Sequence, residues 1–338
     1  MLIGLTYDLR SEYLAMGFDE IETAEFDRED TIEALEQALR GLGHRTDRIG
    51  HGWSLAERLV RGDSWDLVFN IAEGLSGYGR EAQIPALLDL YQIPYTFSDP
   101  LVMSLSLHKG MAKSVLRDAG LRTAEFAVVE RVEDASSVTF APPYFVKPVA
   151  EGTGKGVSAA SIVESRELLA AACMDLVRRY SQPALVERLL PGREFTVGIT
   201  GTGAAARALG TLEVVTLEGA EQGIHSYINK ERCEELVDYR LVIADGDPPV
   251  AEAEELALAA WKVLGCRDAG RVDIRCDDEG RANLLEINPL AGLHPTHSDL
   301  PILCIRLGIP YVDLIGRIVR SAAERRGGIE RRVPRRCA

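Results

Sequence analysis

The sequence predicts an α/β protein that begins with a doubly wound parallel sheet, because strand-like and helical segments alternate through the first hundred residues. The strands are expected near 1–6, 45–49, 66–70 and 93–96, and the helices at 31–42 and 80–91. Strands separated by helices pair in parallel, and ligands of such sheets bind beyond the carboxyl ends of the strands. Asp8, Glu73 and Arg80 follow the first and third strands, so we expect them to face a substrate.

Apolar periodicity supports the helices of this region. In the first helix, Ile32, Leu35 and Leu39 fall on one face, and Gly43 follows its end. Pro85 must kink or restart the second helix, because proline lacks a backbone N–H. The remainder of the chain is expected to hold a helical stretch at 106–120, a strand at 143–148, mainly strands over 184–218, a polar mobile loop at 219–240, a helix at 250–264, a hairpin at 271–288 and a final helical region.

Length and charge exclude several classes of protein. With 338 residues the chain predicts two or three packed units. A net charge of −14 repels phosphate backbones, which excludes a nucleic acid partner. No apolar run reaches the ~20 residues of a membrane span, and the chain opens on a strand rather than a signal peptide. The six cysteines form no C-x-x-C pair. We therefore expect a cytoplasmic protein with reduced thiols.

A glycine-rich segment follows the strand that ends at Lys147. It reads Lys147-Pro148-Val149-Ala150-Glu151-Gly152-Thr153-Gly154-Lys155-Gly156. Glycines let backbone N–H groups approach a phosphate, and lysines neutralise it. The segment is not a Walker A loop, because Gly156 stands where that motif has Ser or Thr. A flexible hairpin turn is the alternative interpretation.

Oxygen-bearing side chains gather on the hairpin 271–288. Alternation places Asp273 on one face of its strand, and Glu286 and Asn288 together on the return strand. With a turn at 277–280, Asp273 lies opposite position 284 and diagonal to Glu286. Carboxylate and amide oxygens suit Mg²⁺ rather than zinc. A solvated hairpin face is the alternative.

Other segments offer weaker signals. Glu187 and Glu194, beside a Pro-Gly turn, suit adenine and ribose, although such glutamates are more often surface residues. Residues 201–206 match G-x-G-x-x-A, but a strand follows instead of a helix, which argues against a dinucleotide site. His294 and His297 suggest a metal pair; the carboxylates nearby favour a substrate-facing or structural His297.

Several motifs together resemble the ATP-grasp superfamily, and within it the D-alanine–D-alanine ligase family. In order they are Ile93-Pro94-Tyr95-Thr96, His108-Lys109, Phe145-Val146-Lys147-Pro148, Glu151-Gly152, Glu194-Phe195-Thr196-Val197, Arg271-Val272-Asp273 and Leu285-Glu286-Ile287-Asn288. The resemblance runs from about residue 60 onward. It implies an N-terminal Rossmann-like domain at 1–100, followed by the two-domain, α+β ATP-grasp fold, with a lid at 101–183 and a C-terminal domain at 184–338.

The resemblance also implies roles for individual residues. Lys109 and Lys147 are assigned to the phosphates of ATP, Glu187, Arg188 and Leu190 to adenine, and Glu194 to ribose. Glu151, Gly152 and Gly154 also belong to the cofactor-binding set. The magnesium ligands are Asp273, Glu286 and Asn288. The catalytic set is Arg271, Lys230 of the mobile loop, Thr153 in place of the lid serine, and the backbone N–H of Gly292. Ser298 receives the carboxylate of the second amino acid, beside His297.

The N-terminal region departs from the family pattern. Thr6-Tyr7-Asp8-Leu9-Arg10 stands where the family has a glycine-rich segment with a glutamate, Glu73 replaces a histidine, and Glu231 replaces the mobile-loop tyrosine. These changes fall where the first amino acid binds.

The expected activity is ATP-dependent ligation of a carboxylate to an amine through an acyl phosphate. ATP and Mg²⁺ are the expected cofactors. Two magnesium ions are expected, and Mn²⁺ could replace them. Small-molecule substrates are the expected partners, and no membrane association is expected. The family resemblance implies a homodimer. Two alternatives stay open, a ligase for another acid and amine, and a non-catalytic nucleotide sensor.

Overall fold

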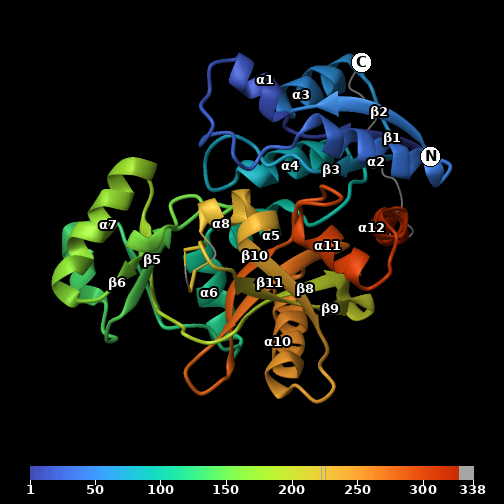
Figure 1. Ribbon diagram of the computed structural model, residues 1–338. Helices are drawn as coiled ribbons and strands as arrows, with labels where there is room; N and C mark the ends of the chain where they lie inside the picture. The colour runs from blue at the N-terminus through green and yellow to red at the C-terminus, as the bar shows by residue number, and fades with distance from the viewer. Residues whose placement is uncertain (222, 225, 327–338) are drawn as a thin grey trace.

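The structure is a computed structural model that describes residues 1–221, 223–224 and 226–326, and its strands form three separate sheets. Figure 1 shows the N-terminal unit at the top in blue, a green unit at the left and the C-terminal unit in yellow to red below. Within the described residues, no helix is both long and apolar enough to cross a bilayer.

The N-terminal unit confirms the predicted α/β class. Its sheet has the order β2-β1-β3 and is parallel throughout: β1 is Leu2–Thr6, β2 is Arg45–Gly50 and β3 is Leu67–Asn70. Helices α1 (Arg10–Ala15), α2 (Glu29–Gly41), α3 (Gly52–Arg61) and α4 (Gln83–Leu90) accompany it. The apolar face of α2 packs into the core through Ile32, Leu35 and Leu39.

Two predicted elements differ in the structure. The expected strand at 93–96 contributes only an isolated parallel bridge between Tyr95 and Val68. Pro94 cannot donate a backbone hydrogen bond there, which limits strand pairing. The expected helix 80–91 is a 3₁₀ turn at Arg80–Ala82 followed by α4, and Pro85 lies in the first turn of α4. Backbone N–H groups of a first turn have no intrahelical acceptor, so the proline is accommodated without a kink.

The middle unit is an antiparallel sheet with the order β4-β7-β5-β6, which we call the lid. Its strands are β4 (Phe126–Val129), β5 (Tyr144–Pro148), β6 (Ile162–Val163) and β7 (Ala184–Arg188), and α7 (Arg166–Tyr180) packs on it. The expected helical stretch at 106–120 is divided into α5 (Pro100–Leu107) and α6 (Lys109–Asp118). His108 separates them, and its ring accepts the N–H of Met111 as a cap of α6.

The C-terminal unit is an antiparallel five-stranded sheet with the order β10-β9-β8-β11-β12. The strands are β8 (Glu194–Thr200), β9 (Arg207–Thr216), β10 (Val237–Val242), β11 (Ala269–Cys276) and β12 (Ala282–Asn288). Helix α10 (Pro248–Leu264) buries Trp261 against this sheet, and α11 (Asp299–Arg306) and α12 (Tyr311–Arg326) follow. The expected polar loop at 219–240 contains α8 (Tyr227–Glu231) and α9 (Cys233–Leu236).

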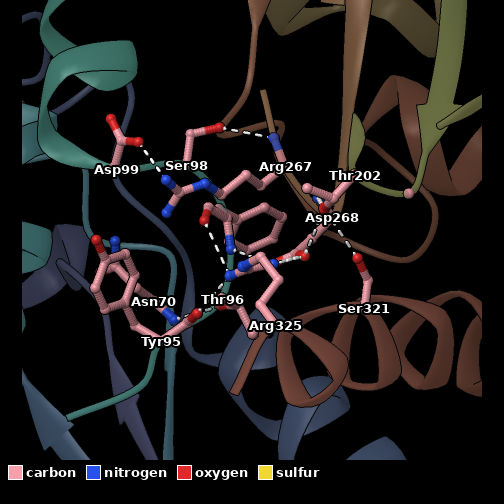
Figure 2. A network of polar contacts seen from close by, with 12 residues as sticks. Asn70, Tyr95, Thr96, Ser98, Asp99, Thr202, Arg267, Asp268, Ser321 and Arg325 are labelled. Atoms are coloured by element: carbon pink, nitrogen blue, oxygen red, sulfur yellow. Dashed lines mark hydrogen bonds and ion pairs between the residues drawn. The ribbon is translucent and has the colours of Figure 1, made fainter. Parts of the chain in front are cut away.

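A polar network joins the first unit to the last, as Figure 2 shows. The carboxylate of Asp268 is fully buried, accepts the N–H of Phe97 at 2.7 Å and forms an ion pair with Arg325 of α12. Arg325 also donates to the carbonyl of Tyr95 at 2.9 Å, and Arg267 pairs with Asp99. These contacts hold residues 95–99 of the N-terminal unit against the C-terminal sheet.

Candidate active site

Two adjoining cavities of about 290 and 90 Å³ are lined by residues from all three units. We call them the larger and the smaller cavity. Four charged residues line both of them, namely Lys109, Glu151, Lys230 and Glu286. The N-terminal segment 24–31 and the loop 287–299 contribute only to the larger cavity, whereas Lys147, Glu187 and Leu190 line only the smaller one.

The hairpin β11–β12 brings the predicted metal ligands together in a register different from the expected one. Cys276 pairs with Ala282, which leaves a turn of five residues at 277–281, and a bulge follows at Leu285. Asp273 is therefore directly opposite Glu286 instead of diagonal to it. The bulge also turns Leu285 toward the smaller cavity while Leu284 and Ile287 pack in the core.

The carboxylates of Asp273 and Glu286 differ in electrostatic environment. Asp273 accepts from Thr196 Oγ1 at 3.0 Å and Asn288 Nδ2 at 3.2 Å, and it pairs with Arg271. Burial raises the pKa of Asp273 to about 6 against the opposing effect of Arg271. Burial acts the same way on Glu286, but Lys109, 3.3 Å away, and other cations hold its pKa well below the usual range.

Glu187 joins two lysines beneath the smaller cavity. Its carboxylate lies 2.8 Å from Lys147 Nζ and 2.7 Å from Lys113 Nζ. Lys113 is fully buried and also donates to Thr123 Oγ1 and to the carbonyl of Leu284. The Glu187 carboxylate is thus engaged by cations, and it orients Lys147 toward the cavity.

The remaining residues predicted for adenine and ribose also line the smaller cavity. Glu194 accepts from Arg275 at 2.9 Å. Leu190 is buried and supplies an apolar wall, whereas Arg188 is exposed and lies 3.3 Å from Glu125.

The glycine-rich segment after β5 folds over both cavities. Lys109 Nζ donates to the carbonyl of Glu151 at 2.5 Å, and the Glu151 side chain pairs with Lys155 at 2.8 Å. Thr153 and Gly154 have φ angles of 50° and 71°. This left-handed backbone favours glycine and is uncommon for threonine. Gly152 and Thr153 line the larger cavity, whereas Gly154 lines the smaller one.

The N-terminal unit contacts this segment through Glu25, a residue that the sequence did not single out. Its carboxylate accepts the N–H of Gly152 at 2.6 Å and pairs with Arg80 at the same distance. Arg80 is buried and also donates to the carbonyl of Ala150 at 2.8 Å. Arg80 therefore supports the lid segment and does not line either cavity.

Asp8 is likewise turned away from both cavities, whereas Glu73 lines the larger one. Asp8 accepts from Tyr13 Oη at 2.6 Å and from the N–H of Gly74 at 2.8 Å, so it shapes the loop that carries Glu73.

Three carboxylates line the larger cavity near this loop. They are Asp27, Glu73 and Glu81. Within the described part of the chain, no hydrogen bond or ion pair reaches their side chains. Burial raises the pKa of Asp27 to about 8 and that of Glu81 to about 7, and it raises the pKa of Glu73 strongly. Neighbouring carboxylates add to each increase, which makes this wall of the cavity suited to a cationic group.

The loop before α11 completes the opposite part of the larger cavity. Arg271 lies between Asp273 and Asp299, 3.5 Å from the latter. Ser298 Oγ accepts the N–H of His294 at 3.0 Å. A Cβ atom at Gly292 would lie 2.7 Å from Ser298 Oγ, so a side chain at this position would displace the serine hydroxyl. His297 Nδ1 faces Glu234 and Cys233, whose thiol pKa is raised to about 12 by burial.

Sequence comparison identifies the family to which this chain is related. The family model described as D-ala D-ala ligase C-terminus matches residues 115–320. A D-alanine–D-alanine ligase of Bordetella petrii is 34% identical over 295 residues, covering 86% of each chain. One of Geobacter sulfurreducens is also 34% identical, over 86% of this chain and 87% of its own.

The chain belongs to the D-alanine–D-alanine ligase family. It is an ATP-dependent ligase of that family, which confirms the predicted class of activity. The crystal structure of D-alanine–D-alanine ligase from Bacillus anthracis complexed with ATP matches the fold with a TM-score of 0.72. That match has 19% sequence identity and covers 97% of this chain and 99% of the other.

In this ligase, sequence reasoning missed Glu25 and Lys113, although each contacts a predicted site residue. Glu25 lies in an acidic stretch without periodicity, and its partner Gly152 is 127 positions away. Lys113 lies on a helix that also carries exposed charged residues, so its burial had no local signal.

Proposed function

We propose that this ligase joins the carboxylate of one amino acid to the amine of a second, with D-alanine as the first candidate for both. The proposal depends on one observation: lysines of the middle unit and carboxylates of the hairpin β11–β12 line the same two adjoining cavities. Lys109 lies 3.3 Å from Glu286, and both residues line both cavities. The names of the relatives supply the candidate substrate.

The smaller cavity is the proposed nucleoside site. Leu190 offers an apolar contact for adenine, and Glu194 offers acceptors for ribose hydroxyls. Lys147 and Lys109 then lie along the triphosphate and neutralise its charge, which phosphoryl transfer requires. Because Glu187 is engaged by two lysines, we assign it the orientation of Lys147.

The donor set of Asp273, Glu286 and Asn288 fits magnesium. All three provide hard oxygen atoms on adjacent, paired strands. The pKa of Asp273 is raised and that of Glu286 is lowered, so Glu286 is the carboxylate that stays anionic and can bind a cation. When bound there, Mg²⁺ supplies compensation for the negative charge of the phosphates.

The protein's own residues account for the steps that follow. A carboxylate oxygen of the first substrate attacks the γ-phosphorus, and the bond to the leaving ADP breaks. Arg271 and the N–H of Gly292 stabilise the charge on the resulting acyl phosphate and tetrahedral intermediate. The amine of the second substrate attacks the carbonyl carbon, and phosphate leaves. Ser298 orients the second substrate, while Lys230, Thr153 and the glycine-rich segment exclude water.

A second candidate has specific support from the acidic wall of the larger cavity. Among the described residues, no hydrogen bond or ion pair reaches the side chains of Asp27, Glu73 and Glu81, which line the part of the cavity proposed for the first substrate. Burial and the neighbouring carboxylates raise the pKa of all three carboxyls, and a cationic ligand would oppose this effect by favouring their charged forms. A first amino acid with a second amino group in its side chain would satisfy more of these carboxylates than alanine does.

One experiment separates the candidates. ADP release is measured with Mg²⁺ and ATP against D- and L-amino acids, including diamino acids and other carboxylates, and products are identified by mass. Release with D-alanine alone, and formation of its dipeptide, supports the first candidate. Release with a diamino acid supports the second. ATP binding without ADP release across the whole panel contradicts both. Sedimentation analysis tests the homodimer that the family resemblance implies.

A further inference from the structure

Three side chains with different donor atoms meet beside the larger cavity. Cys233 and Glu234 belong to α9, and His297 belongs to the loop before α11. His297 Nδ1 lies 3.6 Å from Cys233 Sγ and 2.9 Å from Glu234 Oε1. The donor atoms of the three residues all lie within 4.8 Å of one another. The cluster is formed by segments that are 64 positions apart.

The other histidine of this loop is occupied elsewhere. His294 Nδ1 accepts the N–H groups of Thr296 and His297 at 3.3 and 3.2 Å. Its Nε2 atom lies 3.2 Å from Asp30 and 2.7 Å from Arg28. His294 and His297 therefore do not form the metal pair that their spacing suggests, and Cys233 is the partner of His297.

We propose that Cys233, Glu234 and His297 form a binding site for a soft divalent cation, represented by Zn²⁺. Sulfur and imidazole nitrogen are donors that zinc prefers, whereas magnesium prefers oxygen alone. At a tetrahedral angle, Zn–S of about 2.3 Å and Zn–N of about 2.0–2.1 Å place sulfur and nitrogen about 3.5–3.6 Å apart. The observed separation of Sγ and Nδ1 is 3.6 Å, which lies within that range.

The burial and exposure of the three side chains also suit such a site. Cys233 is held in an apolar cluster with Leu212 and Leu236 and is 3% exposed, so the sulfur position is fixed. The Glu234 side chain is 62% exposed and can move outward from its hydrogen bond to accommodate an ion. His297 lines the larger cavity, which gives an ion access and leaves a coordination position for water.

Occupancy of this site would connect two segments that the ligase uses. Cys233 follows Lys230 by three positions, and His297 directly precedes Ser298. An ion bound by both would tie the 227–236 segment to the loop before α11 and oppose its opening. We expect reversible inhibition of turnover by zinc. This effect rests on the proposed function, whereas binding of the ion does not.

Binding is tested first, without turnover. The full-length chain is freed of metal by a chelator and titrated with Co²⁺, which takes the place of Zn²⁺ and absorbs light when bound to a thiolate. We expect one equivalent with thiolate-to-cobalt absorption that Zn²⁺ displaces. Cys233→Ala should abolish that absorption, and Glu234→Gln should weaken affinity about tenfold or more, at least the loss typical of an outer-shell partner. Cys173→Ala, buried in the lid core, is the matched control and should bind normally.

Turnover is then measured with saturating Mg²⁺ and increasing Zn²⁺. Glu234 is exposed and does not line either cavity, so Glu234→Gln should retain basal activity and require about tenfold more zinc for inhibition. Absence of thiolate-to-cobalt absorption, or unchanged affinity in Cys233→Ala, would overturn the site. Normal binding with no inhibition of an active ligase would overturn the connection between the two segments, and an inactive protein that still binds cobalt would contradict only the proposed function.

Discussion

The Glu25 carboxylate accepts the backbone N–H of Gly152 at 2.6 Å and so joins the N-terminal unit to the glycine-rich segment of the lid. The same carboxylate pairs with Arg80, which in turn holds the carbonyl of Ala150. The lid segment is therefore held at two backbone positions by one buried ion pair. Closure of the lid depends on residues outside the lid itself.

Glu25→Gln should weaken lid closure while preserving the shape of the side chain. Hydrogen bonds to charged groups contribute about 1.5–3 kcal/mol, which corresponds to about a 10- to 150-fold decrease in kcat/KM for ATP. Limited proteolysis within 150–158 should accelerate in parallel. Glu33→Gln, an exposed change on α2, is the control. Unchanged kcat/KM in a folded Glu25→Gln protein would show that the contact does not stabilise the closed lid.

Glu286→Ala should remove turnover, because cations from the lid and the hairpin converge on this carboxylate. Loss of one preorganised electrostatic partner typically lowers kcat by a factor of about 100 to 1,000. The rate of ADP release at saturating ATP and Mg²⁺ measures the change. Glu279→Ala alters the exposed turn of the same hairpin and should leave the rate intact. A near-normal rate in Glu286→Ala would remove the proposed magnesium assignment.

Asp268→Asn should destabilise the contact between the N-terminal and C-terminal units. Asp268 is fully buried and faces Arg325, Thr202 and the N–H of Phe97. Breaking a buried ion pair costs about 3–5 kcal/mol, and the partial exposure of Arg325 favours the lower end of that range. Thermal and urea unfolding should both show the loss. The exposed Asp245→Asn change is the comparison, and equal midpoints for the two variants would contradict the prediction.

The contribution of Asp27 to the stability of the protein should decrease as pH rises from about 4 to 8. Burial raises the pKa of this carboxyl to about 8 from its ordinary value near 3.8. Between these values the folded state holds a proton that the unfolded state has released, so rising pH favours unfolding. Asp27→Asn should therefore be more stable than the parent at pH 8, and the difference should vanish near pH 4. Urea unfolding at both values, with exposed Asp118→Asn as control, checks the sign.

Local patterns were sufficient to single out Lys147 and Glu286, both of which line the cavities. Lys147 ends a strand and precedes glycines, and Glu286 lies in an alternating hairpin, so short segments carry both signals. The predicted register of the hairpin was wrong, because the structure has a five-residue turn and a bulge instead of the assumed four-residue turn. The adjacent pair Leu284 and Leu285 interrupts the alternation and marks that bulge.

Long-range contacts could not be predicted in the same way. Glu25 and Lys113 obtain their roles from partners that the fold brings near, Gly152 across 127 positions and Leu284 across 171. Asp8 and Arg80 had the expected placement after strands, yet both face supporting contacts instead of a cavity. Strand ends indicate where ligands bind, whereas side-chain direction depends on packing.

The Arg325–Asp268 network has a consequence for exchanging parts between ligases. Residues 95–99 present two carbonyls and an N–H to the charged side chains of Asp268, which directly precedes β11, and Arg325 of α12. In a chimera that receives only the first hundred residues of another ligase, Asp268 and Arg325 would lose the backbone partners that Tyr95 and Phe97 provide. An exchange of the N-terminal unit would therefore have to include the segments around 267–268 and 321–325, even though neither lines the two cavities.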